Sequence, residues 1–515
     1  AEQPLNLLRA GEGDVRLASR GGDGFHAGGP ADKLLDDVHE VAQADRLPLL
    51  VVEGQVQGKL GPELLIEAHS VEDGVLLGRL RQAVTRARDP VVRDAADELR
   101  DRLDTARTAV ERARAQIDSG FQLLSAFAAR HDEERSEYDH RLRLTPGLRH
   151  DPAWEDVEGA WDVLARSLRV VIQTLEWARG VVDALDDDEL TEIDDLATEL
   201  DALVRIGQQL VEQIQSTLVA PDPAMIHWLS QRPSTQEIAV HAAPLRVGGA
   251  LREHLFDRCR STVLTSATLT TNGEFSFIRD RLGIDDADEL IVPSPFDYQR
   301  STLLYLANDI PEPGQHGHAR ELHETIINLC RATRGHAMVL FTSHSALQAA
   351  YRAIKRPLES EGILVLGQRM DGSPRQLVDR LRSHPEAVLL GTNSFWEGVD
   401  IVGDALSLLI ISKLPFSVPS DPVFAARGEE FDDAFHDYAI PQAILRFKQG
   451  FGRLIRSASD RGVCAVLDRR IVSRRYGRSF VASLPTCTVE EGSAAALPDR
   501  ASAWLRVNRG EPVTR

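Results

Sequence analysis

The sequence predicts an α/β protein built from parallel sheets, with a long helical domain inserted into it. From Ser301 onward, short apolar runs of strand length alternate with amphipathic helical segments. This order is typical of right-handed βαβ units and of a parallel sheet covered on both faces. Residues 75–218 instead show helical periodicity throughout, and strand-length runs return only after Pro221. The helical block therefore interrupts an α/β domain.

Length and charge limit the possible classes of protein. The chain has 515 residues, of which 59 are Lys or Arg and 79 are Asp or Glu, and its formal net charge is −20. At roughly 100–200 residues per domain, this length predicts about three or four folding units and excludes a single small domain. Apolar runs such as Leu406–Ser412 are far shorter than the ~20 residues of a membrane span. We expect no membrane anchor and no export signal.

The cysteines predict neither a metal finger nor a disulfide framework. Cys259, Cys330, Cys464 and Cys487 form no CxxC pair, so a reducing cytoplasm is the simplest location. The chain begins at Ala rather than Met, which suggests a piece of a longer protein.

Residues 1–74 are expected to begin the interrupted domain, with short strands near Leu47–Glu53 and Glu63–Glu67. Residues 75–229 form the helical insertion, in which prolines 90 and 152, each preceded by Asp, begin helices. Trp154 and Trp161 belong to an apolar stripe at three- and four-residue spacing, which predicts a core face rather than a ligand site. An acidic run over 183–201 predicts a solvated face that repels nucleic acid.

Residues 230–299 are expected to return to the interrupted domain, with strands at Glu237–Leu245 and Ser261–Leu269. Residues 300–490 are expected to form the second α/β domain, and 491–515 a C-terminal tail. The strands predicted in the second domain are 301–307, 336–343, 362–368, 387–393, 406–412 and 462–468, and its helices are 319–333, 345–356, 373–383 and 440–457.

Residues directly after the predicted strands are candidate site residues, because open parallel sheets bind ligands beyond the carboxyl ends of their strands. These candidates are Glu67, His69, Ser266, Ala267, Thr268 and the segment Gly391–Gly403.

A further candidate is the predicted helix that contains Arg446–Ser457. Gln449, Arg453 and Arg456 are spaced to share one helix face, where two arginines could clamp a triphosphate. A solvated basic helix is the alternative interpretation. Ten basic residues lie between Arg446 and Arg478 against two acidic ones, and this local basic surface on an acidic chain favours a phosphate-bearing partner.

Taken in order, these segments resemble the motifs of superfamily 2 helicases, specifically the XPD/DinG branch of DNA helicases, and most closely the bacterial DinG-type helicases. EAH (67–69) is similar to the end of the DEAH motif, TSATL (265–269) to motif III, FWEGVD (395–400) to motif V and QGFGRLIRS (449–457) to motif VI. FTSHSAL (341–347) looks like motif IV, SPFDYQ (294–299) like the join between the motors, and KLPFSVPSDP (413–422) like a loop characteristic of the branch.

The resemblance implies two RecA-like motor domains, the first incomplete here, with the helical insertion as the arch domain. It implies ATP and Mg²⁺ in the cleft between the motors and single-stranded DNA across both, with movement from 5′ to 3′. Glu67 would position the attacking water, Arg453 and Arg456 would be catalytic at the phosphates, and Ser266, Ala267 and Thr268 would couple nucleotide state to DNA. The other residues that the resemblance places at the nucleotide are His69, Glu397, Gly398, Asp400 and Gln449.

The sequence departs from this family in its first 70 residues. Gly54–Leu60 is one residue shorter than a phosphate-binding loop and lacks the hydroxyl that follows the lysine. Ile66 stands where the first Asp of DEAH holds Mg²⁺, and an aliphatic side chain cannot coordinate this cation. No cysteine precedes Cys259, so the family's iron–sulfur cluster has no ligands in this chain.

Two hypotheses of different class follow. The first is an ATP-dependent DNA helicase whose phosphate-binding loop lies in a missing N-terminal segment, together with a nuclease as in some DinG relatives. The second is a helicase-like scaffold that binds nucleic acid or a protein without hydrolysing ATP. In either case we expect single-stranded DNA to contact Thr342, Ser343, Arg446 and Lys448, engaging roughly three to five phosphates.

Overall fold

The computed structural model describes residues 16–18, 50–54, 90–131, 140–183, 193–232, 237–271, 273–384, 386–396 and 406–507. The chain divides into two compact units. The helical unit comprises Ala44–Arg246 and Pro419–Arg427, and the sheet unit comprises Ala1–Gln43, Val247–Val418 and Gly428–Arg515.

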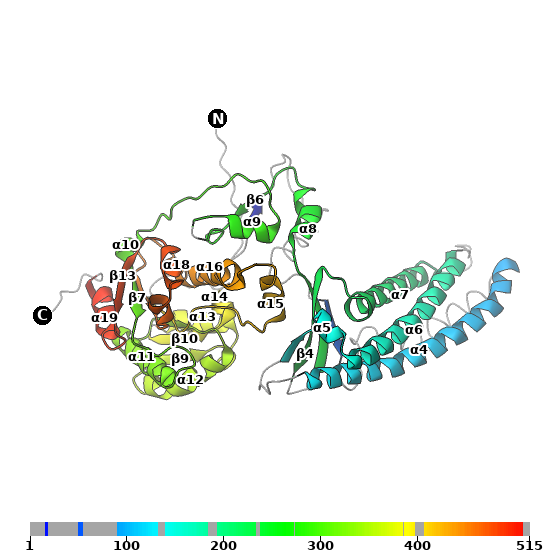
Figure 1. The fold of residues 1–515 in the computed structure, drawn as a ribbon, viewed down its shortest axis with the longest axis horizontal. Coiled ribbons are helices and arrows are strands. Elements are labelled where there is room, and N and C mark those ends of the chain that lie inside the picture. The colour runs from blue at the N-terminus through cyan, green and yellow to red at the C-terminus, as the bar shows by residue number, and fades with distance from the viewer. Residues whose placement is uncertain are drawn as a thin grey trace. The chain divides into compact units, whose positions relative to one another are not determined.

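Three long helices dominate the helical unit: α4 (Pro90–Arg130), α6 (Pro152–Asp183) and α7 (Ile193–Ile214) (Figure 1). The Asp151 carboxylate accepts from the amide of Ala153 at 2.8 Å and so caps α6, as the Asp-Pro pattern predicts. Trp161 is 1% exposed and packs edge-on against Phe121, with ring centroids 5.2 Å apart. The tryptophan stripe is therefore core, as predicted.

A four-stranded antiparallel sheet packs on these helices, in the order β2 (Leu50–Gly54), β5 (Glu237–Pro244), β4 (Met225–Arg232) and β3 (His140–Arg143). Ile238 and Val240 on β5 are buried in the same apolar core as Trp161. For this reason the unit extends to Arg246, whereas the sequence predicted a boundary at residue 229.

One segment of the helical unit comes from far along the chain. Helix α15 (Pro422–Gly428) follows Asp421, whose carboxylate pairs with Arg141 at 2.7 Å. The Arg427 side chain is buried, and its guanidinium donates to the carbonyls of Leu245 and Pro244, each at 3.2 Å. These contacts hold α15 against the end of β5.

Acidification is expected to destabilise the helical unit through His227 on β4. Burial and the nearby Arg149 guanidinium lower the pKa of His227 to about 4, whereas an unfolded histidine titrates near 6.5. As the pH falls, the unfolded chain therefore takes up the proton before the folded chain does. The stability that neutral His227 contributes is fully present above pH 6.5 and is lost as the pH falls towards 4. The expected loss between pH 7 and pH 5 is about 2 kcal/mol.

Urea unfolding of the whole chain at pH 7 and at pH 5 measures this loss of unfolding free energy. Hydrogen exchange of the β4 and β5 amides serves as the probe of the helical unit. The variant His227→Leu should show a shallower pH dependence. Part of the dependence should remain, because burial and Arg141 also lower the pKa of His241 to about 4. An unchanged pH dependence in the variant would contradict the assignment to His227.

The core of the sheet unit is a seven-stranded parallel sheet in the order β13-β7-β12-β11-β8-β10-β9. This confirms the α/β prediction for the second domain. The strands are β7 (Thr302–Ala307), β8 (Ala337–Leu340), β9 (Leu364–Gly367), β10 (Ala387–Gly391), β11 (Leu408–Ile411), β12 (Gly462–Val466) and β13 (Thr488–Gly492).

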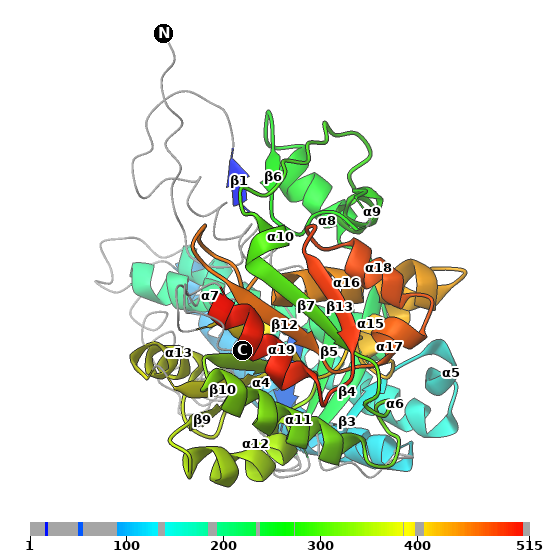
Figure 2. The same cartoon turned by 90° about the vertical axis from the view of Figure 1, so that its left-hand side faces the viewer.

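Helices cover both faces of this sheet, and each face has its own apolar core. One core includes α13 (Pro374–Ser383), α16 (Ile440–Phe451) and α18 (Gly477–Ala482). The other includes α11 (His318–Thr333), α12 (His344–Glu359) and α19 (Leu497–Val507), with α19 beside α11 (Figure 2).

The sheet unit extends beyond the predicted boundary at residue 490. That boundary falls inside β13, which pairs with β7 at the edge of the sheet. Leu497 and Ala501 on α19 are fully buried. The predicted tail therefore contributes a strand and a helix to the domain.

The part of the sheet unit before Tyr298 contains α8 (Gly248–Leu251), α9 (Ser276–Leu282) and β6 (Val263–Thr265). β6 pairs antiparallel with β1 (Arg16–Ala18). The elements α8, α9 and β6 come from the predicted 230–299 segment, of which the part from Val247 onward falls in the sheet unit. Across the described residues, no helix is both long and apolar enough to cross a membrane.

Candidate functional site

The carboxyl edge of the seven-stranded sheet brings together the segments after β8, β10 and β9. These three strands are neighbours in parallel register, with Gly391 opposite Leu340 and Leu390 opposite Gly367. The pairing continues one residue further, because the Phe341 amide donates to the carbonyl of Gly391 at 2.8 Å and the Gln368 amide to that of Leu390 at 3.1 Å. Residues that are far apart in the sequence thus begin their loops side by side.

The loop after β8 carries the two hydroxyls predicted to contact DNA. Thr342 is half-buried and Ser343 is exposed. The Ser343 hydroxyl oxygen accepts from the amide of Ala346 at 3.3 Å, so Ser343 is the N-cap of α12. The Ser343 hydroxyl also lies 3.1 Å from that of Ser345, and either of the two can donate to the other. When Ser345 donates, the Ser343 proton is able to donate to another acceptor.

A buried polar network that the sequence did not predict connects the loops after β9, β10 and β8. Gln368 is 8% exposed, and its side-chain oxygen accepts from the amide of Thr392 at 2.7 Å and from its hydroxyl at 2.9 Å. The Gln368 side-chain nitrogen donates to the Ser394 hydroxyl at 2.7 Å. Thr392 also lies 3.2 Å from Nε2 of His344, whose pKa is lowered by burial and by the charge of Arg369.

Trp396 joins the segments that resemble motifs IV, V and VI. Its ring is fully buried, and Nε1 donates to the Phe341 carbonyl at 2.9 Å. A Cβ on Gly450 would lie 2.7 Å from the ring, so only glycine lets α16 approach this closely. The Trp396 carbonyl accepts from the Arg453 guanidinium, at 3.2 Å from Nη2.

The predicted helix face of Gln449, Arg453 and Arg456 is wrong, because α16 ends at Phe451. Arg453 and Arg456 follow in the turn after the helix, where Arg453 is 6% exposed and Arg456 is exposed. The amide of Arg456 donates to Asp460 at 2.8 Å. The two arginines therefore occupy different environments, and Arg456 is the more accessible one.

Lys448 on α16, predicted to contact DNA, instead lies close to the turn that contains the predicted coupling residues. Its ammonium donates to the Thr270 carbonyl at 2.8 Å, and burial lowers its pKa. Thr270 follows the turn in which the Thr268 amide donates to the Ser266 hydroxyl at 3.2 Å, and Ala267 lies between them. Lys448 thus bonds to the residue directly after the segment that resembles motif III, an arrangement that does not favour its predicted DNA contact.

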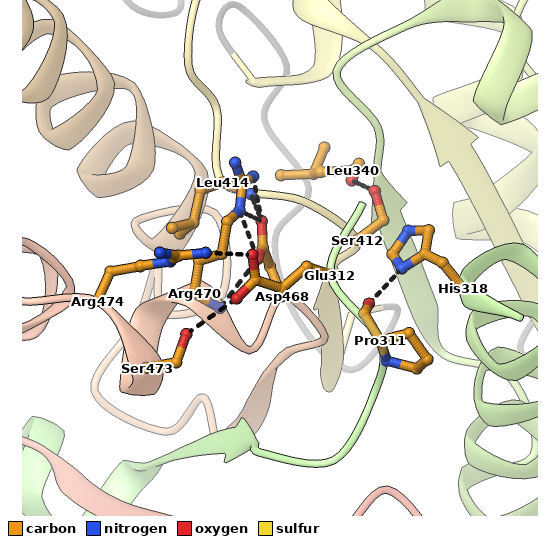
Figure 3. A network of polar contacts seen from close by, with 10 residues as sticks. All are labelled: Pro311, Glu312, His318, Leu340, Ser412, Leu414, Asp468, Arg470, Ser473 and Arg474. Carbon is orange, nitrogen blue, oxygen red and sulfur yellow. Dashed lines mark hydrogen bonds and ion pairs between the residues drawn. The ribbon is translucent and has the colours of Figure 1, made fainter. Parts of the chain in front are cut away.

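A second polar network lies at the carboxyl ends of β12, β11 and β7 (Figure 3). The Asp468 carboxylate is fully buried and accepts from Arg470 Nη2 at 2.6 Å and from the Leu414 amide at 2.9 Å. It thereby fixes the start of the loop that follows β11. Nearby, Arg474 pairs with Glu312 at 2.7 Å, closer to the surface.

Several predicted site residues lie outside the part of the chain that the structure describes: Glu67, His69, Glu397, Gly398 and Asp400. Within the described residues, His, Cys, Asp and Glu side chains form no group that could hold a metal ion.

Comparison with known proteins matches residues 326–487 to the family described as the helicase C-terminal domain. The chain is 39% identical over 256 residues to the ATP-dependent DNA helicase YoaA of Escherichia coli, covering 49% of this chain and 40% of that protein. It is 35% identical over 308 residues to the 3'-5' exonuclease DinG of Bacillus subtilis, covering 58% of this chain and 33% of that protein.

The ATP-dependent helicase DinG of Mycobacterium tuberculosis is 38% identical over 277 residues, covering 52% of this chain and 41% of that protein. The chain thus spans less than half the length of each of these three relatives. Residues 326–487 therefore carry a helicase C-terminal domain, and the chain is similar to DinG and YoaA helicases, as its motifs predicted.

Proposed function

We propose that this chain is part of an ATP-dependent DNA helicase of the DinG type, in which ATP hydrolysis drives movement 5′ to 3′ along single-stranded DNA. The observation that carries the proposal is the packing around Trp396. This one side chain contacts the segments that resemble motifs IV and VI and is itself part of the segment that resembles motif V. In such an arrangement a shift of Arg453 would displace Trp396 and, through it, the Phe341 carbonyl at the sheet edge.

The described residues fit one part of the nucleotide site. Arg456 is exposed and lies close enough to Tyr298 for its charge to oppose the burial that raises the pKa of Tyr298. An exposed guanidinium there could bind a phosphate. Arg453 supports the fold by holding the Trp396 carbonyl. The described residues offer no carboxylate set for Mg²⁺, so we derive no hydrolysis step from them.

The 515-residue chain alone is expected to release no phosphate from ATP above background, with or without DNA. Phosphoryl transfer depends on a loop lysine and on Mg²⁺ to position and neutralise the phosphates. This sequence has neither a complete loop nor an Asp at residue 66. A phosphate-release assay measures this directly, and DNA-stimulated release that Glu67→Gln abolishes would contradict it.

The decisive comparison is with a longer protein that includes whatever the gene encodes upstream. If the helicase proposal is right, this protein hydrolyses ATP when single-stranded DNA is added, and Arg456→Ala slows it by about a hundredfold because a charge-stabilising group is lost. A control such as Arg352→Gln, on an exposed arginine of α12, should leave the rate unchanged. A longer protein that binds DNA without hydrolysing ATP would instead support the scaffold hypothesis.

A further inference from the structure

The sheet edge contains an exposed cation that belongs to none of the helicase-like motifs. Arg369 directly follows Gln368 at the end of β9, and its side chain is exposed. Of the two cations predicted to contact DNA, Lys448 donates to Thr270, and Arg446 is half-buried on α16. An exposed cation beside the hydroxyls after β8 would give a phosphate bound there a charged partner.

The backbone holds Arg369 in an unusual position. Its φ of 65° lies in the left-handed region, which a non-glycine residue seldom occupies. The surrounding turn is fixed on both sides, since the Gly367 amide donates to the Asp371 carboxylate at 2.8 Å and the Met370 amide donates to the Gly367 carbonyl at 3.1 Å. Such backbone strain is found most often at functional sites.

The buried Gln368 amide orients a second phosphate ligand. Its side-chain oxygen is occupied by the amide and hydroxyl of Thr392, so its NH₂ group must face Ser394. The exposed Ser394 hydroxyl accepts that bond at 2.7 Å, which leaves its own proton to donate outward. This O–H donor and Arg369 thus follow two neighbouring strands, β10 and β9, at the same sheet edge.

Arg369 supplies a positive charge at this edge. Its guanidinium forms no ion pair with any of the described residues, and its charge, together with burial, lowers the pKa of His344. Among the described residues, no carboxylate is hydrogen-bonded to the side chains of Gln368, Thr392 or Ser394. An anion placed here gains a charge-assisted bond from Arg369.

We propose that Arg369 and Ser394, positioned by Gln368, bind a backbone phosphate of single-stranded DNA beside the Thr342–Ser343 loop. This inference rests on the proposed function, because it assumes that DNA crosses the carboxyl edge of the sheet. It adds a basic contact in the turn after β9 and assigns Gln368 as a positioning residue.

The test is the affinity of the full chain for a fluorescein-labelled oligothymidine of about 20 nucleotides, measured by anisotropy across a salt series. Arg369→Asn removes the charge but tolerates the left-handed backbone. It should weaken binding about five- to tenfold at low salt and make the log–log salt slope shallower by about 0.7, the contribution of one phosphate on a single strand. Arg369→Lys keeps the charge and should show most of the wild-type salt slope. Ser394→Ala should weaken binding but leave the salt slope unchanged.

Arg352→Gln is the matched control, since it removes one exposed charge from the neighbouring helix α12 and should change neither quantity. If the wild-type chain binds with a clear salt dependence and Arg369→Asn binds equally well, the inference is wrong and the proposed function stands. If the wild-type chain does not bind the oligonucleotide, both are wrong.

Discussion

Replacement of Trp396 by alanine is expected to lower the free energy of unfolding of the sheet unit by about 3–5 kcal/mol. The ring is fully buried and lies against the backbone of α16, where Gly450 has no side chain to fill the space that the ring would leave. The Nε1 bond to the Phe341 carbonyl is lost at the same time. Native-state hydrogen exchange of the β8 and β10 amides measures the loss.

Trp396→Phe separates these two contributions. It keeps most of the apolar contact and removes the hydrogen bond, so it should cost clearly less than alanine, with about 1–3 kcal/mol from the unsatisfied Phe341 carbonyl. Equal losses in the two variants would show that the hydrogen bond alone stabilises this position, contrary to the packing described.

The second large effect is expected at Asp468. Asp468→Ala leaves the partly buried Arg470 guanidinium and the Leu414 amide without their carboxylate. Removing one partner from a buried pair costs about 3–5 kcal/mol. The loop after β11 should also lose its fixed start, so its amides should exchange faster.

Glu312→Ala is the control within the same network. Glu312 pairs with Arg474, whose side chain is 53% exposed, and a solvent-exposed pair of this kind contributes little to the free energy of unfolding. If Glu312→Ala and Asp468→Ala lowered the free energy of unfolding by similar amounts, burial would not explain why Asp468 matters more than Glu312.

The sequence predicted the strands and helices of the second domain well where apolar runs are continuous. Strands β7 to β12 are buried along most of their length, which produces the runs that were recognised. β13 was missed because it is an edge strand that includes Glu490 and Glu491, and alternate residues are only partly buried. Such a strand gives no apolar run.

The site was predicted less completely, because its geometry depends on contacts between distant segments. Gln368 bonds to Thr392 and Ser394, which are 24 and 26 residues away, and no local pattern connects them. The end of α16 at Phe451 was missed because Arg453 and Arg456 happen to continue the helical spacing. The flanking Gly450 and Gly452 were the available signal for that end.

Hydrogen exchange of the full chain with and without oligothymidine tests the central claim most directly, namely that the carboxyl edge of the seven-stranded sheet is the DNA-binding face. The account predicts slower exchange on DNA binding in the three turns after β8, β9 and β10, around residues 342–345, 368–371 and 392–394. Slower exchange confined to the helical unit or to β13 and α19, with these turns unchanged, would contradict it.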